Sequence, residues 1–171
     1  MYSRKIIYFL NFVLTLYSGC SIAKNSKPLA VFSDWVVFRA IDEKTNKLIC
    51  YTMSLPSRRY DNLNKRGESF FIVFKYAGEK ESEIFLSFGQ IFKREAYNAE
   101  INIQKIKFPI MTHEDKGWAY NYFDDQNIIK ELLRTPIFSI EVEYDNGQKL
   151  IDVYSLNGFT EAYENLLKMC E

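Results

Sequence analysis

Apolar and polar residues alternate with a period of two over several short stretches of the chain, which is typical of β-strands. Residues 34–41 show this alternation, and the turn-type residues 42–46 separate them from the apolar-rich residues 48–53. This arrangement predicts a β-hairpin. Residues 69–76 are apolar nearly throughout, which predicts a strand buried on both of its faces.

Three more strands are expected in the middle of the chain, at residues 83–88, 99–103 and 105–111. Their short spacing favours antiparallel connections. Residues 54–67 contain Pro56 and too little apolar material for a core element, so they predict a loop. Four basic residues are spread through this loop: Arg58, Arg59, Lys65 and Arg66.

The last third of the chain combines two short helices with a hairpin. Asp124 or Asp125 can cap a helix that ends before Pro136, because proline disfavours helical geometry in the residue before it. Residues 137–144 alternate in polarity, and the Asp-Asn-Gly turn that follows predicts a second hairpin. A C-terminal amphipathic helix is expected to lay one apolar stripe on the sheet. The stripe comprises Phe159, Ala162, Tyr163, Leu166, Leu167 and Cys170.

Length and composition indicate one globular domain. The chain has 171 residues, of which 47% are apolar, and its 12 Tyr and 14 Phe occur mainly beside β-branched residues. We therefore expect an all-β fold with minor α content, a sandwich or barrel of antiparallel strands with a short C-terminal helix. The 22 basic and 22 acidic residues balance, so nothing in the net charge favours nucleic acid as a partner.

The first 23 residues have the order of a secretory signal peptide. Arg4 and Lys5 precede an apolar stretch at residues 6–17, and Ser21 and Ala23 are the small residues that a signal peptidase reads. We predict cleavage after Ala23, which makes residues 24–171 the mature domain. The apolar stretch is about a dozen residues, shorter than the roughly 20 that span a membrane. Removing two basic residues leaves 22 − 2 = 20 against 22 acidic ones, a net charge near −2.

A lipoprotein box is the alternative interpretation of the same segment. Residues 16–20 resemble such a box, which would make Cys20 an acylated N-terminus, although Tyr17 stands where an aliphatic residue is usual. The expected location is therefore periplasmic or secreted, or, if Cys20 is lipidated, the outer membrane. Only a lipidated chain is expected to have a membrane partner.

Cleavage leaves two cysteines, Cys50 and Cys170, which an oxidising compartment is expected to join. In the loop-entropy model, closing a loop of on the order of 100 residues contributes roughly 4 to 5 kcal/mol. A redox pair or metal site is the alternative, but the chain has no CxxC motif and one His. The residues therefore favour a structural disulfide.

Recognisable catalytic motifs are absent from the sequence: it has no glycine-rich phosphate loop, nucleophile elbow, HExxH or EF-hand loop. We predict no catalytic, cofactor-binding or metal-binding residues. His113, Glu114 and Asp115 are adjacent and form a solvated turn on this interpretation, with a metal or acid-base site as the alternative. The basic loop is expected to be solvated rather than to bind an acidic surface, since Asp61 and Glu68 lie among its charges.

Aromatic residues gather around residues 118–123. Trp118, Tyr120, Tyr122 and Phe123 are expected to lie in the core or half-buried. The alternative is an exposed aromatic platform for a sugar or a membrane.

Several short segments, read in order, carry a resemblance to a known family. They include Asp34-Trp35, Cys50-Tyr51 followed by Pro56, Arg66-Gly67-Glu68 and Gly117-Trp118-Ala119. The most specific segment is residues 152–162, which contains Asp152, Tyr154, Ser155, Leu156, Gly158 and Phe159, with Cys170 after it. The chain resembles the invasion-associated locus B family of exported alphaproteobacterial proteins over nearly its whole mature length. Its aromatic- and lysine-rich composition departs from that family.

The resemblance implies an immunoglobulin-like antiparallel β-sandwich, a periplasmic or surface location, and an association with virulence and host-cell invasion whose molecular basis is not established. It carries over no catalytic residue. We therefore expect a non-enzymatic protein that binds an unidentified protein or envelope partner through loops on a rigid scaffold. The alternative is a periplasmic hydrolase or metal-dependent enzyme whose site is assembled only in three dimensions. A His113→Ala variant separates the two, because it would abolish function only in the enzyme.

Overall fold

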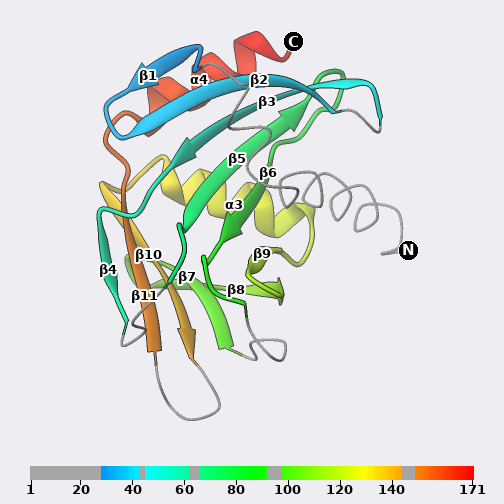
Figure 1. The fold of residues 1–171 in the computed structure, drawn as a ribbon. Helices are drawn as coiled ribbons and strands as arrows, with labels where there is room; N and C mark the ends of the chain where they lie inside the picture. The colour runs from blue at the N-terminus through cyan, green and yellow to red at the C-terminus, as the bar shows by residue number, and fades with distance from the viewer. Residues whose placement is uncertain (1–27, 43–44, 62–65, 92–97, 144–148) are drawn as a thin grey trace.

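The structure, a computed structural model, describes residues 28–42, 45–61, 66–91, 98–143 and 149–171 (Figure 1). The predicted signal peptide, Cys20, Lys65 and the turn at 145–147 lie outside the described residues. Eleven strands are described: β1 (Ala30–Phe32), β2 (Trp35–Asp42), β3 (Lys47–Ser54), β4 (Arg58–Tyr60), β5 (Phe70–Tyr76), β6 (Glu83–Ser87), β7 (Asn98–Ile103), β8 (Ile106–His113), β9 (Lys116–Ala119), β10 (Ile137–Glu143) and β11 (Lys149–Ser155). The helices are α3 (Tyr122–Leu132) and α4 (Phe159–Met169). This confirms the all-β class with minor α content.

All the described strands pair antiparallel, in the order β1-β2-β3-β5-β6-β9-β8-β7-β10-β11-β4. We call β1, β2, β3, β5 and β6 the first half-sheet, and β7, β10, β11 and β4 the second half-sheet. The strands β9 and β8 link the two. The sheet bends, so that the inner faces of the halves approach each other as in a sandwich (Figure 1). Whether this arrangement is immunoglobulin-like stays a prediction.

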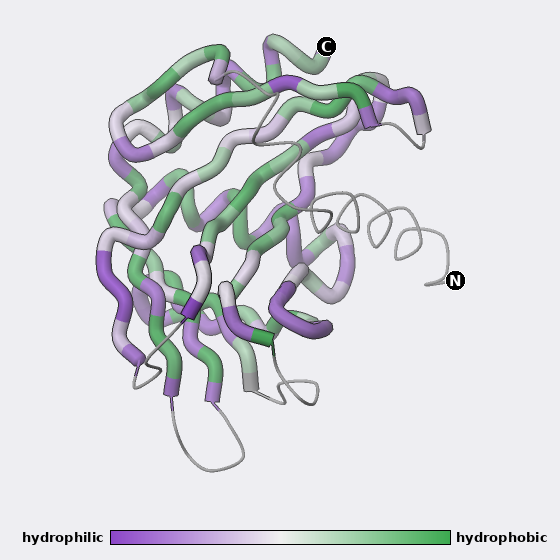
Figure 2. Tube along the Cα trace, in the orientation of Figure 1, coloured by the Kyte–Doolittle hydropathy of each residue, from purple (hydrophilic) through white to green (hydrophobic). Residues whose placement is uncertain are grey.

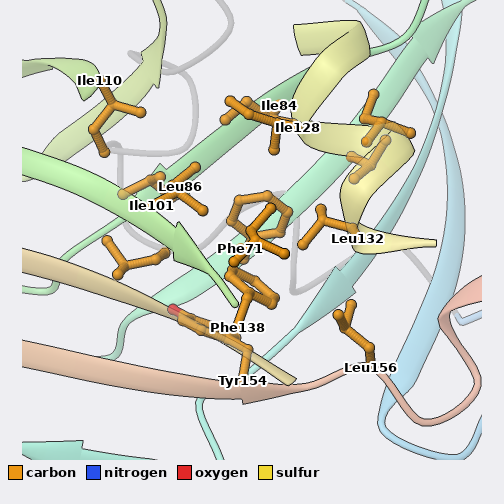
Figure 3. Close-up of a cluster of buried hydrophobic side chains, with 14 of the residues drawn as sticks. Phe71, Ile84, Leu86, Ile101, Ile110, Ile128, Leu132, Phe138, Tyr154 and Leu156 are labelled. Carbon is orange, nitrogen blue, oxygen red and sulfur yellow. The ribbon is translucent and has the colours of Figure 1, made fainter. Parts of the chain in front are cut away.

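The main core lies between the two half-sheets. Phe71 of β5 contacts Phe138 of β10 at a ring-centroid distance of 4.9 Å and Tyr154 of β11 at 6.0 Å. Figure 3 shows these three rings at the centre, with Ile128 of α3 above them and Leu132 of α3 to the right of Phe71. All five side chains are buried. Because both half-sheets and α3 meet here, this cluster accounts for much of the apolar surface that the fold removes from water.

Helix α3 covers one end of this core, but it begins earlier than the sequence predicts. Its N-cap is Asn121, whose side chain accepts hydrogen bonds from the backbone amides of Phe123 (2.9 Å) and Asp124 (3.2 Å). The prediction that Asp124 or Asp125 caps the helix is therefore wrong. Asp125 is buried and accepts a hydrogen bond from the amide of Ile84 on β6 (2.9 Å), so it docks the helix on the sheet instead.

Two further expectations need correction. The predicted loop 54–67 contains β4, a short strand that pairs with β11 and appears mostly purple in Figure 2, because Arg58 and Arg59 belong to it. Two short strands, β1 and β9, fall where no strand was predicted. All three strands have four residues or fewer, and a period of two is not detectable over so short a run.

The C-terminal helix lies as the sequence predicts, with one apolar stripe against the sheet. Phe159, Ala162, Leu166 and Cys170 are buried along it, and α4 packs on the inner side of β1, β2, β3 and β5. None of the helices in the described part of the chain is long and apolar enough to cross a membrane.

Candidate functional site

The residues that carry the family resemblance lie mostly at one junction, where β11 leads into α4. The indole Nε1 of Trp35 donates a hydrogen bond to the carbonyl oxygen of Ser155 (3.0 Å). The same indole lies 4.6 Å from the ring of Phe159, and Leu156 donates from its amide to the carbonyl of Pro136 (2.8 Å). Trp35 and Phe159 are fully buried. These residues therefore join β2, β11 and α4 into one packed unit.

Gly158 begins α4 with a backbone conformation that favours glycine. Its φ is +84°, in the left-handed region, and it is the N-cap of the helix. A Cβ atom at this position would collide with the carbonyl oxygen of Phe32 on β1. Glycine is thus required here both for the sharp turn and for the close approach of β1.

A buried ion pair, Arg66 with Asp152, is the main polar feature that the structure brings together. The Arg66 guanidinium holds both carboxylate oxygens of Asp152, with Nη1 donating to Oδ1 at 2.8 Å and Nη2 donating to Oδ2. The side chains are 2% and 1% exposed. Arg66 also donates to the carbonyl of Phe88 through Nε and to Asp61 through Nη1 at 3.2 Å. With these further partners, each nitrogen of the guanidinium has at least one protein acceptor.

Charges around this pair balance it. Arg59 of β4 lies 3.8 Å from Asp152 and donates to the carbonyl of Gly67 (2.7 Å). Burial by itself would lower the pKa of Arg66, but the hydrogen bond and attraction from Asp152, helped by Asp61, raise it above its usual value. The guanidinium therefore stays charged, and it anchors the chain at residue 66 to β11.

Two hydroxyl groups beside the ion pair lack ordinary partners. The Tyr154 hydroxyl approaches the Ser69 hydroxyl, but neither forms a hydrogen bond of normal geometry within the described structure. Both residues are buried. Burial, followed by the nearby charge of Asp152, raises the pKa of Tyr154 well above its usual range. This tyrosine therefore remains neutral in the folded protein.

The predicted disulfide is present. Cys50 of β3 and Cys170 at the end of α4 are bonded, with a Cα–Cα distance of 5.8 Å, and both are fully buried. They pack with Leu166 in a small apolar cluster. The bond spans 120 residues of sequence and fixes the end of the chain to the first half-sheet. Its position inside an apolar cluster supports a structural role.

His113 lies exposed at the turn between β8 and β9, as predicted for a solvated turn. Asp115, two residues later, accepts a hydrogen bond from the Ser87 hydroxyl (3.0 Å) and lies 3.9 Å from Lys116. Among residues 28–171, with the undescribed gaps set aside, no group of three or more His, Cys, Asp or Glu side chains is placed to hold a metal ion.

The aromatic residues between β9 and α3 behave differently from the expectation. Trp118 is half-buried, but Tyr120, Tyr122 and Phe123 are 44%, 37% and 67% exposed. The prediction that these side chains lie in the core or half-buried is wrong for these three, which are exposed. We call Tyr120, Tyr122 and Phe123 the aromatic corner. Its rings are held at a fixed place, because Asn121 caps the helix between them and the rings of Tyr122 and Phe123 lie 4.5 Å apart.

Sequence reasoning missed the Arg66–Asp152 pair, although one signal for it was present. On β11, Leu150, Asp152 and Tyr154 point to the same inner face, and all three are buried. An acidic residue on the core face of a strand needs a buried cationic partner. Which of the four basic residues in the 54–67 segment supplies that partner depends on the loop conformation, which no local pattern encodes.

Comparison with known proteins adds no relative. No protein-family model matches the sequence, and no curated protein or solved structure is significantly similar to the chain.

Proposed function

We propose that this chain is an exported, non-enzymatic binding domain that engages a protein partner through the aromatic corner. The observation that carries the proposal is the exposure of Tyr120, Tyr122 and Phe123 on a rigid helix start. Aromatic rings supply large contact areas with little loss of side-chain entropy, and they are enriched where proteins bind one another.

The surroundings of the corner favour a protein partner over a sugar. The rings of Tyr122 and Phe123 are tilted by 46° relative to each other, so they do not form the flat platform on which a sugar ring stacks. Asp124 lies in the first turn of α3 beside them and is paired to Asn121 (2.7 Å). An apolar cluster with a polar rim is the usual anatomy of a protein interface.

The resemblance to the invasion-associated locus B family supports a role for this binding in the bacterial envelope or at the host-cell surface. The disulfide supports a periplasmic or secreted location, because such bonds persist in oxidising compartments. On this proposal, the disulfide-bonded sheet is the scaffold and the corner is the recognition element.

The test is site-specific photo-cross-linking of the full chain in its native envelope. A photoreactive residue at Phe123 should give one discrete adduct, identified by mass spectrometry as a single protein. Leu133 is the matched control, because it is 39% exposed at the other end of the same helix. The Tyr122→Ala variant should reduce the adduct severalfold while near-UV circular dichroism remains unchanged. Equal adducts from positions 123 and 133, or no adduct from either, would overturn the proposal.

A further inference from the structure

The outer faces of the two half-sheets are chemically opposite. On the second half-sheet, the outward residues of β10 and β7 include Glu141 and Glu100, which are directly paired in the register. Lys149 and Lys107 form ion pairs with these two carboxylates. Such a charged ladder is normal for a sheet face in water.

The outer face of the first half-sheet is apolar along three rows that cross β2, β3 and β5, and the row that begins at Val36 continues to Phe85 on β6. We call this surface the aromatic face. Its rows are Phe38–Tyr51–Phe74, Val36–Met53–Ile72–Phe85 and Ala40–Ile49–Tyr76. The rings of Phe38 and Tyr51 stack at 5.0 Å. A contiguous apolar face of this kind is rarely left exposed to water in a folded protein, so another apolar group is expected to cover it.

The described helices do not provide this cover, because both pack on the inner side. Helix α4 meets Cys50 and Val37, and α3 meets Ile84, all of which point to the inner face. Five residues of the aromatic face are nevertheless only 0–7% exposed: Ile49, Tyr51, Ile72, Phe74 and Phe85. These side chains are buried on a face that no described helix or strand covers.

We propose that the aromatic face is the docking site of this chain's own apolar segment 6–17, and that removal of the predicted signal peptide uncovers it. The segment has the composition that an aromatic face accepts: its twelve positions are IIYFLNFVLTLY, with four aromatic rings and no charge. An apolar segment is the kind of partner that fits these rows, and residues 6–17 are the most apolar part of the uncharged stretch 6–23 that precedes the described residues.

The connection between segment and face is long enough. Residues 18–27 separate the segment from Pro28, and ten extended residues reach about 33 Å. The chain then enters the sheet beside the face, where the amide of Leu29 donates to the carbonyl of Val37 on β2 (2.9 Å). Four strands at a spacing of about 4.8 Å span only about 14 Å, so any part of the face is within reach.

The consequence is a surface whose availability depends on maturation. While the segment is attached, it covers the aromatic face; after cleavage behind Ala23, the face becomes free in the mature chain. An apolar surface that is shielded until export is protected from wrong contacts during synthesis. This inference rests on the export in the proposed function, because the face is uncovered by signal-peptide cleavage. It uses a different surface from the aromatic corner, so failure of one can be distinguished from failure of the other.

The first test is photo-cross-linking in the full chain, refolded with the Cys50–Cys170 bond formed and with Cys20→Ser to prevent mispairing. A photoreactive residue replaces Phe38, which is half-buried on the aromatic face, and the control replaces Val153, which is half-buried on the outer face of the second half-sheet. We expect an adduct within one chain between position 38 and a peptide from residues 6–17, and none from position 153. An adduct from position 38 to a second copy, or no adduct, would overturn the proposal.

The second test cuts the folded full chain. A protease recognition sequence is inserted between Ala23 and Lys24, and the binding of an apolar fluorescent dye is followed before and after cutting. Dye fluorescence should rise severalfold on cutting, and the Phe38→Ser/Met53→Ser variant should abolish most of that rise. The matched variant on the other face, Ile151→Ser/Val153→Ser, should leave the rise unchanged. Fluorescence that is the same before and after cutting contradicts the proposal.

Discussion

The two half-sheets are held to distant parts of the chain by two different kinds of bond. In the first half-sheet, the covalent bond between Cys50 and Cys170 fixes the end of α4 to β3. In the second, the buried ion pair between Arg66 and Asp152 fixes the chain just before β5 to β11. Both bonds are enclosed by the fold, and each joins residues more than 80 positions apart, at separations of 120 and 86.

The difference lies in what each bond requires of its surroundings. A disulfide acts mainly by restricting the unfolded chain, and it is compatible with an apolar cluster such as the one around Leu166. A buried ion pair is stable only when both charges keep every hydrogen-bonding partner, because each charge has lost its water. The disulfide is therefore expected to add stability, whereas the ion pair mainly fixes which loop conformation is adopted.

The largest effect is expected from removing the disulfide. The double variant Cys50→Ala/Cys170→Ala should lower the free energy of unfolding by about 4 kcal/mol, since it frees a loop of more than 100 residues in the unfolded state. Urea unfolding followed by circular dichroism measures this change. A reducing agent should destabilise the wild type to a similar extent and leave the double variant unaffected. A double variant as stable as the oxidised wild type would show that the bond does not contribute.

Removing one charge of the ion pair should have the next largest effect. The variant Asp152→Ala leaves Arg66 buried without its main partner, and we expect a loss of about 3 kcal/mol in the same urea experiment. The double variant Arg66→Met/Asp152→Leu should recover most of that loss, because neither charge then remains buried. If the double variant is as unstable as the single one, the pair itself contributes net stability, and the contrast with the disulfide fails.

These two bonds also show how much of the fold the sequence encodes locally. Cysteine counting predicts the Cys50–Cys170 bond, because signal cleavage leaves two thiols to pair. The strands of five or more residues are predicted from alternating polarity or from apolar runs, because such a strand is long enough to show the pattern. The pairing of Arg66 with Asp152 depends on a loop returning to a strand 86 residues later, so no local pattern reports it.

The candidate sites differ in the same way. Residues 152–159 carry the most specific part of the sequence resemblance. In the structure, Ser155, Leu156, Gly158 and Phe159 have a packing role at the start of α4. For the aromatic corner, the sequence favours buried or half-buried side chains over an exposed platform, because most aromatic residues in proteins are covered. The exposure of Phe123 depends on where α3 begins. Because Asn121 caps the helix, α3 begins a few residues earlier in the chain than the sequence predicts, and Phe123 lies in its exposed first turn.

The smallest expected effect comes from Tyr154, next to the ion pair. Its hydroxyl is buried without a hydrogen bond of normal geometry, so Tyr154→Phe should change the free energy of unfolding at pH 7 by less than about 1 kcal/mol. The effect appears at alkaline pH. Burial raises the pKa of Tyr154 in the folded protein, whereas in the unfolded chain the phenol ionises near pH 10.

The raised pKa fixes the sign of this effect. Below pH 10 the phenol is neutral in both states and its contribution to stability is fully present; above pH 10 only the unfolded state releases the proton, so stability falls as the pH rises. By pH 11 this one group should lower the stability of the wild type by about 1.4 kcal/mol, a loss that Tyr154→Phe should not show. Urea unfolding at pH 8 and pH 11 measures the difference, with Tyr122→Phe at the aromatic corner as the control that keeps the wild-type loss. If Tyr154→Phe loses as much stability between pH 8 and pH 11 as the wild type, Tyr154 is not shielded from water in the folded protein. The interior of the second half-sheet around the ion pair would then be less tightly closed than that of the disulfide-bonded half.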